Sequence, residues 1–440
     1  MNYLCRMLKN QENILEKLGI EQLNAMQQEA QEAIQSSAEV VLLSPTGTGK
    51  TLAFLLPVLA ELDRDCQEVQ CVIIAPSREL AIQIEQVARE MGAGFKTNAV
   101  YGGTSFSKDR LELKHRPALL IGTPGRIADH FRRETFPTHT IKTLVLDEFD
   151  KSLEIGFEGE MKQILAALPD LQKKILTSAT QKREVPSFVR LKKPRIINNL
   201  KEQGSQLKIK RILSPEKDKL ETLVEALCHI GNQPGIIFCN FKDTIQRVSA
   251  FLTEKQISHG CFYGGMEQVD RERALIQFRN GSHQLLIATD LAARGLDIPE
   301  IKFIIHYQLP GRKDEFTHRN GRTARMFNDG TAYVLQWEEE NLPDYMGALG
   351  IERLQEAPLP ESSAWTTLFI SGGRKDKISK ADIAGFFFKQ GKLNKDELGV
   401  IELKQDCAFV GVHAAKADQL VEMLDKLRLK NKKVRVSLAN

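Results

Sequence analysis

The chain has 440 residues, of which 42% are hydrophobic, and this composition indicates two or three domains of ordinary size in place of one compact domain. Its seven cysteines contain no C-x-x-C pair, which excludes a disulfide framework or a zinc site of that spacing and indicates reduced thiols. No apolar run approaches the roughly 20 residues of a membrane helix, and the charged start "MNYLCRMLKNQENILEK" is unlike a signal peptide. We expect a cytoplasmic protein without a membrane partner.

The net charge of +4 is distributed unevenly along the chain. Residues 366–440 hold 15 Lys+Arg against 9 Asp+Glu, so this stretch carries +6 and the remainder carries −2. The C-terminal part therefore differs in charge from the rest of the chain.

Short β-branched runs alternate with longer helical patterns along the first two thirds of the chain. The first series begins with "VVLLS" at 40, "CVIIAPS" at 71, "ALLIGTP" at 118, "TLVLDE" at 143 and "KILTSAT" at 174. A second series follows, with "GIIFCN" at 235, "HGCFYGG" at 259, "QLLIATD" at 284, "FIIHYQ" at 303 and "TAYVLQ" at 331. This rhythm predicts two α/β units with parallel sheets, joined by a polar linker around 198–210.

A second break, "LQEAPLPESSAW" at 354–365, precedes a small module with strand patterns in "TLFIS", "GVIELK", "CAFVGVH" and "KVRVSL". These patterns predict a third domain of α+β class. The predicted boundaries are 1–203 and 204–355 for the two α/β domains, 356–365 for a linker, and 366–440 for the last domain.

The segment "SPTGTGKT" at 44–51 lies between the strand pattern "VVLL" and an apolar helix pattern. A triphosphate requires backbone N–H groups, a cation and a magnesium ligand at a helix N-terminus. The residues that could supply them are Thr46, Gly47, Thr48, Gly49, Lys50 and Thr51. Ser44 stands where the strict Walker pattern has glycine, and an ordinary glycine turn is the alternative interpretation.

Three carboxylates follow the strand pattern at 143, in "LVLDEFDKS". A magnesium triphosphate at one strand tip favours a carboxylate on a neighbouring tip. We expect Asp147 to hold Mg²⁺ through water, together with Thr51, and Glu148 to orient and deprotonate the attacking water.

The segment "HRNGRTAR" at 318–325 delivers three guanidinium groups in the second α/β unit. Arginine suits bidentate phosphate contacts, and an arginine supplied across a cleft can neutralise charge in the transition state. A solvated basic face is the alternative for such a cluster.

The ordered motifs together resemble those of DEAD-box RNA helicases, with "DEFD" in the place of Asp-Glu-Ala-Asp. "PSRELA", "GG" at 102–103, "TPGR", "SAT", "ATDLAARGLDIP" and "HRNGRTAR" follow in the family's order. The resemblance implies two tandem RecA-like parallel-sheet domains followed by a small RRM-like α+β domain. It also implies ATP and Mg²⁺ as cofactors and RNA as the partner.

The resemblance further implies roles for individual residues. Arg322 and Arg325 match the arginine fingers, and Gly295 and Asp297 match positions at the nucleotide. The residues that match RNA-contacting motifs are Arg78, Gly102, Gly103, Thr123, Arg126, Gly264, Gly265, Gln268, Arg271, Thr289 and Arg294. Coupling between the two units is implied for Asp150, Ser178, Thr180, His318 and Arg319.

Two positions depart from the family pattern. Gln27 occupies the position of the glutamine that binds adenine in the family, but the usual Pro-Thr before it is absent, and Gln28 is an alternative. Tyr3 is the only upstream aromatic residue that could stack on the base. Phe149 replaces a small residue and requires apolar space behind the site, so we expect activity to survive this replacement.

Residues 366–440 resemble the RNA-binding domain of DbpA-type helicases, which implies an RRM-like fold that tethers the motor to structured ribosomal RNA. Lys375, Lys377, Lys432, Lys433 and Arg435 are candidate phosphate contacts. The predicted function is ATP-dependent local unwinding of RNA, with 23S-type rRNA or the pre-ribosomal large subunit as partner, by a monomer.

Three other classes of protein remain as alternatives. An RNA-binding clamp with a vestigial ATPase would fit the two departures, and a DNA helicase would reveal itself through stimulation by DNA. A small-molecule P-loop kinase would not need the second unit with its arginine motif.

Overall fold

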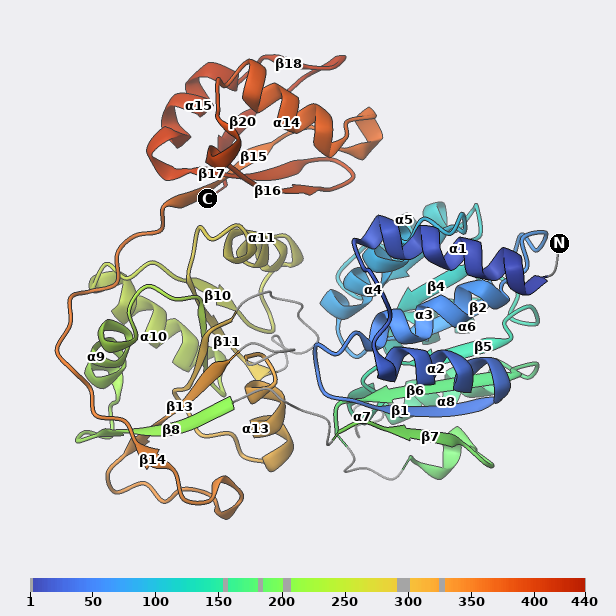
Figure 1. The fold of residues 1–440 in the computed structure, drawn as a ribbon, viewed down its shortest axis with the longest axis horizontal. Coiled ribbons are helices and arrows are strands. Elements are labelled where there is room, and N and C mark those ends of the chain that lie inside the picture. Colours follow the sequence, from blue (N-terminus) through green and yellow to red (C-terminus); the bar gives the residue numbers. More distant parts are fainter. Residues whose placement is uncertain are drawn as a thin grey trace. The chain divides into compact units, whose positions relative to one another are not determined.

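The computed structural model describes residues 3–152, 157–180, 185–200, 207–290, 301–323 and 329–439. The chain divides into two compact units, formed mainly by residues 1–205 and 206–440. Figure 1 traces both units in the colours of the sequence. In the described part of the chain, no helix has the length and apolar character needed to cross a membrane.

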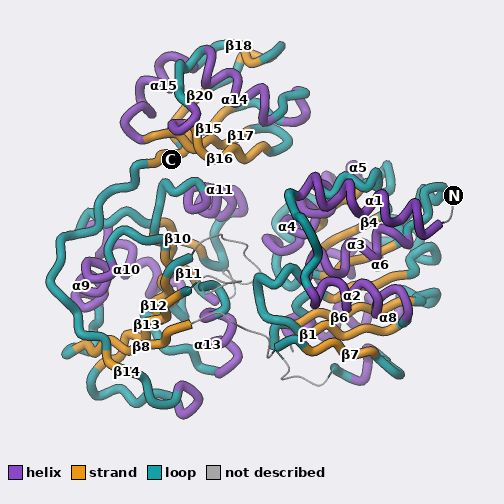
Figure 2. Tube along the Cα trace, in the orientation of Figure 1, coloured by secondary structure: helices purple, strands orange, loops and turns teal. Residues whose placement is uncertain are grey.

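The first unit contains one parallel sheet covered by helices (Figure 2). Its strands are β1 (Glu39–Leu43), β2 (Cys71–Ile74), β3 (Thr97–Val100), β4 (Leu119–Gly122), β5 (Thr143–Leu146), β6 (Lys173–Ser178) and β7 (Arg195–Asn198). Its helices are α1 (Tyr3–Leu18), α2 (Ala25–Ser36), α3 (Lys50–Glu61), α4 (Arg78–Glu90), α5 (Phe106–Glu112), α6 (Pro124–Arg132), α7 (Phe149–Ser152), α8 (Glu158–Ala166) and the 3-10 turn η1 (Ser187–Val189). The strand order is β3-β4-β2-β5-β6-β1-β7.

Alternate residues of each central strand face opposite helical layers. Val40 and Leu42 of β1 pack with α1 to α4, whereas Val41 and Leu43 pack in the second core with α6 and α8. A strand buried on both faces reads as a continuous apolar run, which explains why β1, β2, β4 and β5 were predictable. Phe149 lies in the second core and is 3% exposed, so the apolar space that it requires is present.

The second unit begins with another parallel sheet, ordered β10-β11-β9-β12-β13-β8-β14. Its strands are β8 (Leu207–Ser214), β9 (Gly235–Phe238), β10 (Gly260–Phe262), β11 (Leu285–Ala288), β12 (Phe303–His306), β13 (Gly330–Trp337) and β14 (Gly350–Ile351). The helices are α9 (Leu220–Ile230), α10 (Lys242–Glu254), α11 (Gln268–Arg279), α13 (Lys313–Asn320) and η2 (Asp344–Met346), and α9 and α10 share one core with the strands.

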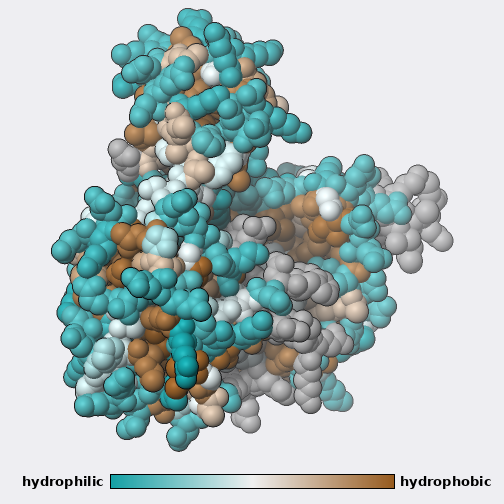
Figure 3. All heavy atoms as spheres, turned by 60° about the vertical axis from the view of Figure 1, so that its left-hand side comes forward, coloured by the Kyte–Doolittle hydropathy of each residue, from teal (hydrophilic) through white to brown (hydrophobic). Residues whose placement is uncertain are grey.

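The C-terminal domain is a four-stranded antiparallel sheet, ordered β16-β17-β15-β20, with helices on one face. Its elements are β15 (Trp365–Ile370), η3 (Arg374–Asp376), α14 (Lys380–Lys389), η4 (Lys395–Glu397), β16 (Leu398–Leu403), β17 (Ala408–His413), η5 (Ala414–Lys416), α15 (Ala417–Leu424), β18 (Arg428–Leu429), β19 (Lys432–Lys433) and β20 (Val436–Leu438). On the face shown in Figure 3, hydrophilic side chains cover most of this domain.

The other face of this antiparallel sheet contacts α11 of the same unit. Phe409 of β17 packs with Ile276 of α11, and Arg279 pairs with Glu402 at 3.4 Å. Part of the apolar surface of the C-terminal domain is therefore buried against the second parallel-sheet domain.

Three details of the predicted secondary structure were wrong. The linker predicted at 198–210 ends too late, because Leu207–Ser214 forms β8 and pairs with β13 along its whole length. Strands β3 and β7 were not predicted, since their residues are mostly exposed or half-buried and form no apolar run. The last strand pattern is split, because Lys432–Lys433 pairs with β18 while Val436–Leu438 pairs with β15.

Candidate functional site

The candidate nucleotide site of the first unit lies at three adjacent strand tips. The P-loop follows β1, the DEFD segment follows β5 and the SAT segment ends β6, and β6 pairs with both of the other strands in parallel. The carboxyl ends of these strands meet at one edge of the sheet, which is where open α/β sheets bind ligands.

The P-loop has the backbone that a phosphate cradle requires. Gly47 and Gly49 have φ values of 82° and 83°, a region that L side chains rarely adopt, and α3 begins directly afterwards at Lys50. The Lys50 ammonium donates to the carbonyls of Ser44 at 2.7 Å and Pro45 at 2.6 Å, and Ser44 Oγ lies 2.8 Å from Thr48 Oγ1. The serine that replaces the Walker glycine thus bonds within the loop.

Gln27 joins helix α2 to the P-loop. Its Oε1 accepts from the Asn24 N–H at 3.0 Å, and its Nε2 donates to the Gly49 carbonyl at 3.3 Å. Asn24 caps α2 and also donates to the Thr48 carbonyl at 3.1 Å. Gln28 bonds back to the Leu23 carbonyl, so of the two glutamines Gln27 is the one placed at the loop. The side chain of Tyr3 lies outside the described residues.

Asp147 is buried, with 3% of its surface exposed. Its Oδ1 accepts from the hydroxyl of Thr177 on β6 and from the Glu148 N–H at 3.1 Å. Burial raises the pKa of Asp147 to about 6, with a further contribution from the charge of Glu148, while Thr177 and Lys50 act in the opposite direction. Burial therefore disfavours the charged form of this carboxylate.

Glu148 has a backbone φ of 48° and stands between β5 and α7. A non-glycine residue in this region costs about 1–2 kcal/mol, and such strain is concentrated at functional sites. The side chain is half-buried, whereas the Phe149 side chain after it anchors the turn in the core.

The three predicted coupling residues of the first unit come together. Thr180 Oγ1 donates to Asp150 Oδ2 at 3.3 Å, and the Thr180 N–H donates to Ser178 Oγ at 3.0 Å. These bonds tie the DEFD turn to the end of β6.

Arg78 and the Gly102-Gly103 turn also come together, after β2 and β3. A Cβ added to Gly103, which has a φ of 90°, would lie 2.4 Å from Arg78 Nη1. The arginine side chain could move away, so it is the positive φ of Gly103 that disfavours a side chain at this position.

Arg126, in the first turn of α6 after its N-cap residue Thr123, is held by internal partners. Its Nε lies 2.7 Å from Asp109 Oδ2, and its Nη2 donates to the backbone carbonyl of Thr104 and, at 3.0 Å, to Thr104 Oγ1. Asp109 Oδ2 also lies 3.4 Å from Nε2 of the buried His130. The Arg126 side chain is 12% exposed, and its two bonds to Thr104 brace the turn that follows Gly103.

The predicted RNA-contacting residues described in the second unit flank β10 and α11. Gly264 and Gly265 follow β10, Gly265 has a φ of 91°, and Gln268 begins α11. The Arg271 guanidinium lies over the Phe262 ring at 4.8 Å, and the Thr289 N–H donates to the Phe262 carbonyl at 3.3 Å. These segments therefore meet at the carboxyl end of β10.

Arg319 is 1% exposed and uses its guanidinium inside the second unit. It forms two bonds with the Asp290 carboxylate, the first from Nε to Oδ1 at 2.7 Å. It also donates to the Gln308 carbonyl at 2.8 Å and to Asn240 Oδ1 at 2.7 Å. This network joins α13 to the segments that follow β9, β11 and β12.

Arg322 and His318 are both buried, at 4% and 8% exposed, and Arg322 Nε lies 3.4 Å from the His318 carbonyl. The predicted residues Arg294, Gly295, Asp297 and Arg325 lie outside the described residues.

The sequence did not reveal the partners that hold the motif segments, namely Asn24, Thr177, Asp109, Asn240 and Gln308, or His130, which lies beside Asp109. Only Asn24 had a local signal, because it forms a capping box with Gln27 three residues later.

Family models match three consecutive parts of the chain. A DEAD/DEAH box helicase model matches residues 24–188, a helicase conserved C-terminal domain model matches 218–327, and a DbpA RNA binding domain model matches 367–438.

Two relatives align with nearly the whole chain. The chain is 30% identical to the ATP-dependent RNA helicase DbpA of Bacillus subtilis, over 97% of this chain and 96% of the relative. It is also 30% identical to DbpA of Escherichia coli, over 96% of each chain.

Solved structures agree in fold. S. cerevisiae Dbp5 bound to RNA and ADP BeF3 superposes with a TM-score of 0.67 at 26% identity, covering 76% of this chain and 87% of that chain. Mss116p bound to ssRNA and AMP-PNP gives a TM-score of 0.69, covering 75% and 73% of the two chains. The two parallel-sheet domains are thus RecA-like, and the chain belongs to the DbpA group of the DEAD-box ATP-dependent RNA helicases.

Proposed function

We propose that this RNA helicase uses Mg²⁺-ATP hydrolysis to separate short stretches of structured RNA in the large ribosomal subunit or its precursor. The observation that carries the nucleotide part is the meeting of the P-loop, Asp147 and Ser178 at the ends of β1, β5 and β6. The rRNA part rests on the C-terminal domain and on the relatives that share it.

The proposed ATP site divides its chemistry among the residues of the first unit. The P-loop N–H groups from Thr46 to Thr51 and the Lys50 ammonium would bind the phosphates. Lys50 must then exchange its two carbonyl partners for phosphate oxygens. Gln27, already bonded to the P-loop, would link recognition of adenine to the position of that loop.

Asp147 and Thr51 are the residues that would hold Mg²⁺. The fit rests on the donor set, since a buried carboxylate with a raised pKa gains from a divalent cation and Mg²⁺ prefers oxygen ligands. Bound Mg²⁺ would supply charge neutralisation for the phosphates. Glu148, beside it on the strained turn, would act as the general base for water.

The second unit would complete the site through Arg322 and Arg325 as arginine fingers and through Gly295 and Asp297 at the nucleotide. Asp150, Ser178, Thr180, His318 and Arg319 would couple hydrolysis to closure of the two units. A site completed from two units predicts slow hydrolysis by the free enzyme.

RNA would lie along the rims of both RecA-like domains, on sequence-independent phosphate contacts. In the first domain Arg78, Gly102, Gly103 and Thr123 would contact it. In the second domain the contacts would come from Gly264, Gly265, Gln268, Arg271, Thr289 and Arg294. The internal bonds of Arg126 favour a supporting role for that residue.

Three of the five candidate phosphate contacts in the C-terminal domain form ion pairs, Lys375 with Asp406 at 2.6 Å, Lys432 with Asp376 at 2.7 Å and Arg435 with Asp425 at 3.0 Å. Lys377 and Lys433 are exposed, and no ion pair joins them to a carboxylate within the described residues. These two lysines are therefore the better candidates for a direct RNA contact.

The experiment measures steady-state ATP hydrolysis without nucleic acid, with generic single-stranded RNA, with matched DNA and with large-subunit rRNA. Stimulation mainly by that rRNA supports the proposal, whereas equal stimulation by every RNA removes the rRNA assignment and leaves the helicase. No hydrolysis under any condition would favour the clamp with a vestigial ATPase.

A variant then tests the targeting domain. Deletion of residues 366–440 would expose Ile276 and its neighbours on α11, so point substitutions are preferable. Lys377→Gln with Lys433→Gln should raise the rRNA concentration needed for half-maximal stimulation and leave generic RNA unchanged. Lys389→Gln with Lys392→Gln, an equal change of charge on the same domain, is the matched control. A monomeric state and a cytoplasmic location remain predictions within this proposal.

A further inference from the structure

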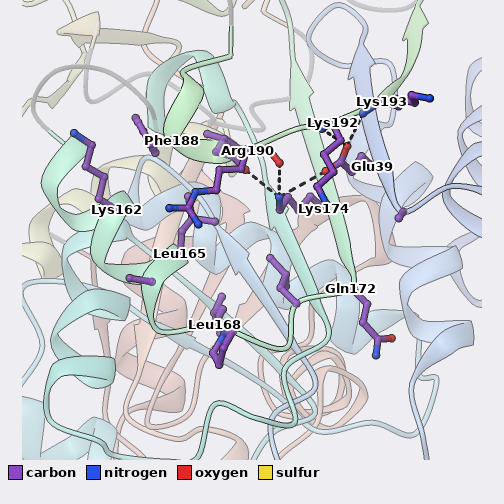
Figure 4. A pocket seen from close by; sticks show the side chains of 15 residues that line it. Glu39, Lys162, Leu165, Leu168, Gln172, Lys174, Phe188, Arg190, Lys192 and Lys193 are labelled. Carbon is purple, nitrogen blue, oxygen red and sulfur yellow. Dashed lines mark hydrogen bonds and ion pairs between the residues drawn. The ribbon is translucent and has the colours of Figure 1, made fainter.

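The first unit also has a pocket with basic residues in its lining, away from the motifs. It is a cavity of about 1210 Å³ at the starts of β1 and β6, lined also by α8 and by the segment from Phe188 to Lys193 (Figure 4). The strand starts form the amino edge of the parallel sheet, whereas the nucleotide and RNA motifs follow the carboxyl ends of the strands. This amino-edge pocket is therefore separate from the site described above.

Cations dominate the rim of the amino-edge pocket. The five basic residues that line it are Lys162, Lys174, Arg190, Lys192 and Lys193, against the single carboxylate of Glu39. Glu39 pairs with Lys174 at 3.6 Å, and its Oε2 accepts the N–H groups of Lys192 at 2.6 Å and Lys193 at 3.0 Å. Lys162 pairs with Glu158 at 2.6 Å, so the excess of positive charge on the rim comes from Arg190, Lys192 and Lys193.

Lys174 also holds the backbone segment that forms the rim of the amino-edge pocket. The Lys174 ammonium donates to the carbonyls of Val189 at 3.0 Å and Arg190 at 2.9 Å. Figure 4 labels Lys174 and Arg190 at the pocket wall. Arg190 has the left-handed conformation, with φ 53° and ψ 50°, which costs about 1–2 kcal/mol for a residue with a side chain. The two bonds from Lys174 hold this conformation in place. The side chains of Arg190, Lys192 and Lys193 are exposed.

The floor of the pocket is apolar. Leu165, Leu171 and Phe188 are half-buried and pack against the core, and the Lys162 ammonium lies 5.5 Å from the centroid of the Phe188 ring. An inorganic anion would contact only the basic rim and would leave the apolar floor exposed to water. A ligand that carries both a phosphate and a flat apolar face uses both parts of the pocket.

We propose that the amino-edge pocket binds a nucleotide of single-stranded RNA, with its phosphates on Arg190, Lys192 and Lys193 and its base against Leu165 and Phe188. Arginine and lysine at a rigid rim suit phosphate oxygens, and an aromatic floor suits any base. RNA is the polyanion on which this helicase acts, so the pocket extends the RNA-binding surface to the far edge of the first RecA-like sheet.

The position of the pocket sets the length of RNA that reaches it. Strand β6 has six residues and spans roughly 20 Å at about 3.3 Å per residue. An oligouridylate just long enough to fill the motif edge cannot also occupy the amino edge, whereas one several times longer can. The pocket should therefore add affinity only for the longer RNA.

The test compares two full-length triple variants. Arg190→Gln, Lys192→Gln and Lys193→Gln together remove three rim charges while keeping the backbone bonds to Glu39 and Lys174. The control neutralises Arg89, Arg132 and Lys142, which lie elsewhere on the same unit with side chains that are 39%, 63% and 44% exposed. Affinity for the short and the long oligouridylate is measured against salt concentration, together with ATPase stimulation by the short one.

The proposal predicts that the affinity of the rim variant for the long RNA depends less on salt concentration than that of the unmodified protein. For the short RNA the salt dependence of affinity should not change. Each phosphate contact on a single strand contributes about 0.7 to the slope of log affinity against log salt, so three lost contacts lower it by about 2. Irradiation of long RNA containing 4-thiouridine should also crosslink to residues 162–193. Short-RNA binding and ATPase activity should not change, which separates this proposal from the assignment of the motif residues.

Other results would overturn the proposal. An equal loss for both RNA lengths, or an equal loss in the control variant, would assign the effect to general charge. Displacement of a crosslink by inorganic phosphate would indicate a free-phosphate site, and displacement by polyglutamate in preference to RNA would indicate an acidic protein partner.

Discussion

Replacing Asp109 with alanine tests whether the internal bonds of Arg126 support the fold and the RNA edge of the first unit. Asp109 is 5% exposed and lies 2.7 Å from Arg126 Nε, and it is the carboxylate beside the buried His130. Loss of one partner from a buried ion pair costs about 3–5 kcal/mol. Arg126 keeps its bonds to Thr104 and is 12% exposed, so we expect the low end, about 3 kcal/mol.

In a unit of this size, each kcal/mol lowers the melting temperature by about 2–4 °C, so Asp109→Ala should lower one thermal transition by roughly 6–12 °C. Asp109→Asn keeps an acceptor and should lose less. In the RNA-titrated ATPase assay, the concentration of RNA for half-maximal stimulation should rise while the maximal rate stays the same, because the turn after Gly103 loses its brace.

The matched control is Asp129→Ala on α6, the helix that carries Arg126. Asp129 pairs with Arg133 at 3.0 Å, and the Arg133 side chain is 57% exposed, so this pair should contribute less than about 1 kcal/mol. A double-mutant cycle with Arg126→Ala completes the test, because Asp109 acting through Arg126 predicts non-additive losses. Equal effects of Asp109→Ala and Asp129→Ala, or additive losses in the cycle, would refute the reasoning.

Three further predictions concern titratable groups. Glu148→Gln should lower ATP turnover by about 100-fold or more while nucleotide binding persists, and unchanged steady-state hydrolysis would contradict its role as general base. Burial raises the pKa of Asp147 to about 6, so the folded chain favours the protonated carboxyl group, and the stability that this gives is lost as pH rises through 6. Asp147→Asn should therefore raise the melting temperature of the nucleotide-free chain at pH 8 but not near pH 4. An equal rise in melting temperature at both pH values would contradict this. Burial, with a further contribution from Arg319, lowers the pKa of His306 to about 3, so below about pH 6.5 the unfolded chain binds a proton at this residue that the folded chain does not. The free energy of unfolding of the second unit, measured with urea, should therefore fall from pH 8 to pH 5. His306→Phe should make this fall smaller.

The central strands were predictable because burial on both faces leaves an uninterrupted apolar run, as in Cys71–Ile74. Edge strands carry a weaker signal, since Arg195–Asn198 exposes three of its four residues. Strand β8 was mistaken for a linker because its lysines alternate with Leu207 and Ile209, a half-buried pattern that its polar surroundings hid.

The motif residues of the site were predictable because each follows a strand, and parallel strands bring their ends to one edge. Their supporting partners were not, because the bonds cross long stretches of sequence. Asp109 and Arg126 are 17 residues apart, Asp290 and Arg319 are 29 apart, and Thr177 and Asp147 are 30 apart. No local pattern encodes which strand tips become neighbours.

The arginines of this chain show why a motif residue need not touch the ligand. A guanidinium has five N–H donors in a fixed fork, and Arg319 directs them at Asp290, Gln308 and Asn240 while 1% of its surface is exposed. A group bonded in this way cannot also reach a phosphate without giving up a buried ion pair, a cost of about 3–5 kcal/mol. Arg319 therefore fixes the end of α13 from which Arg322 follows, and charge-preserving Arg319→Lys should impair hydrolysis because an ammonium cannot reproduce the fork. Full activity of Arg319→Lys would show that the positive charge of residue 319 is sufficient and that the fork geometry of the guanidinium is not needed.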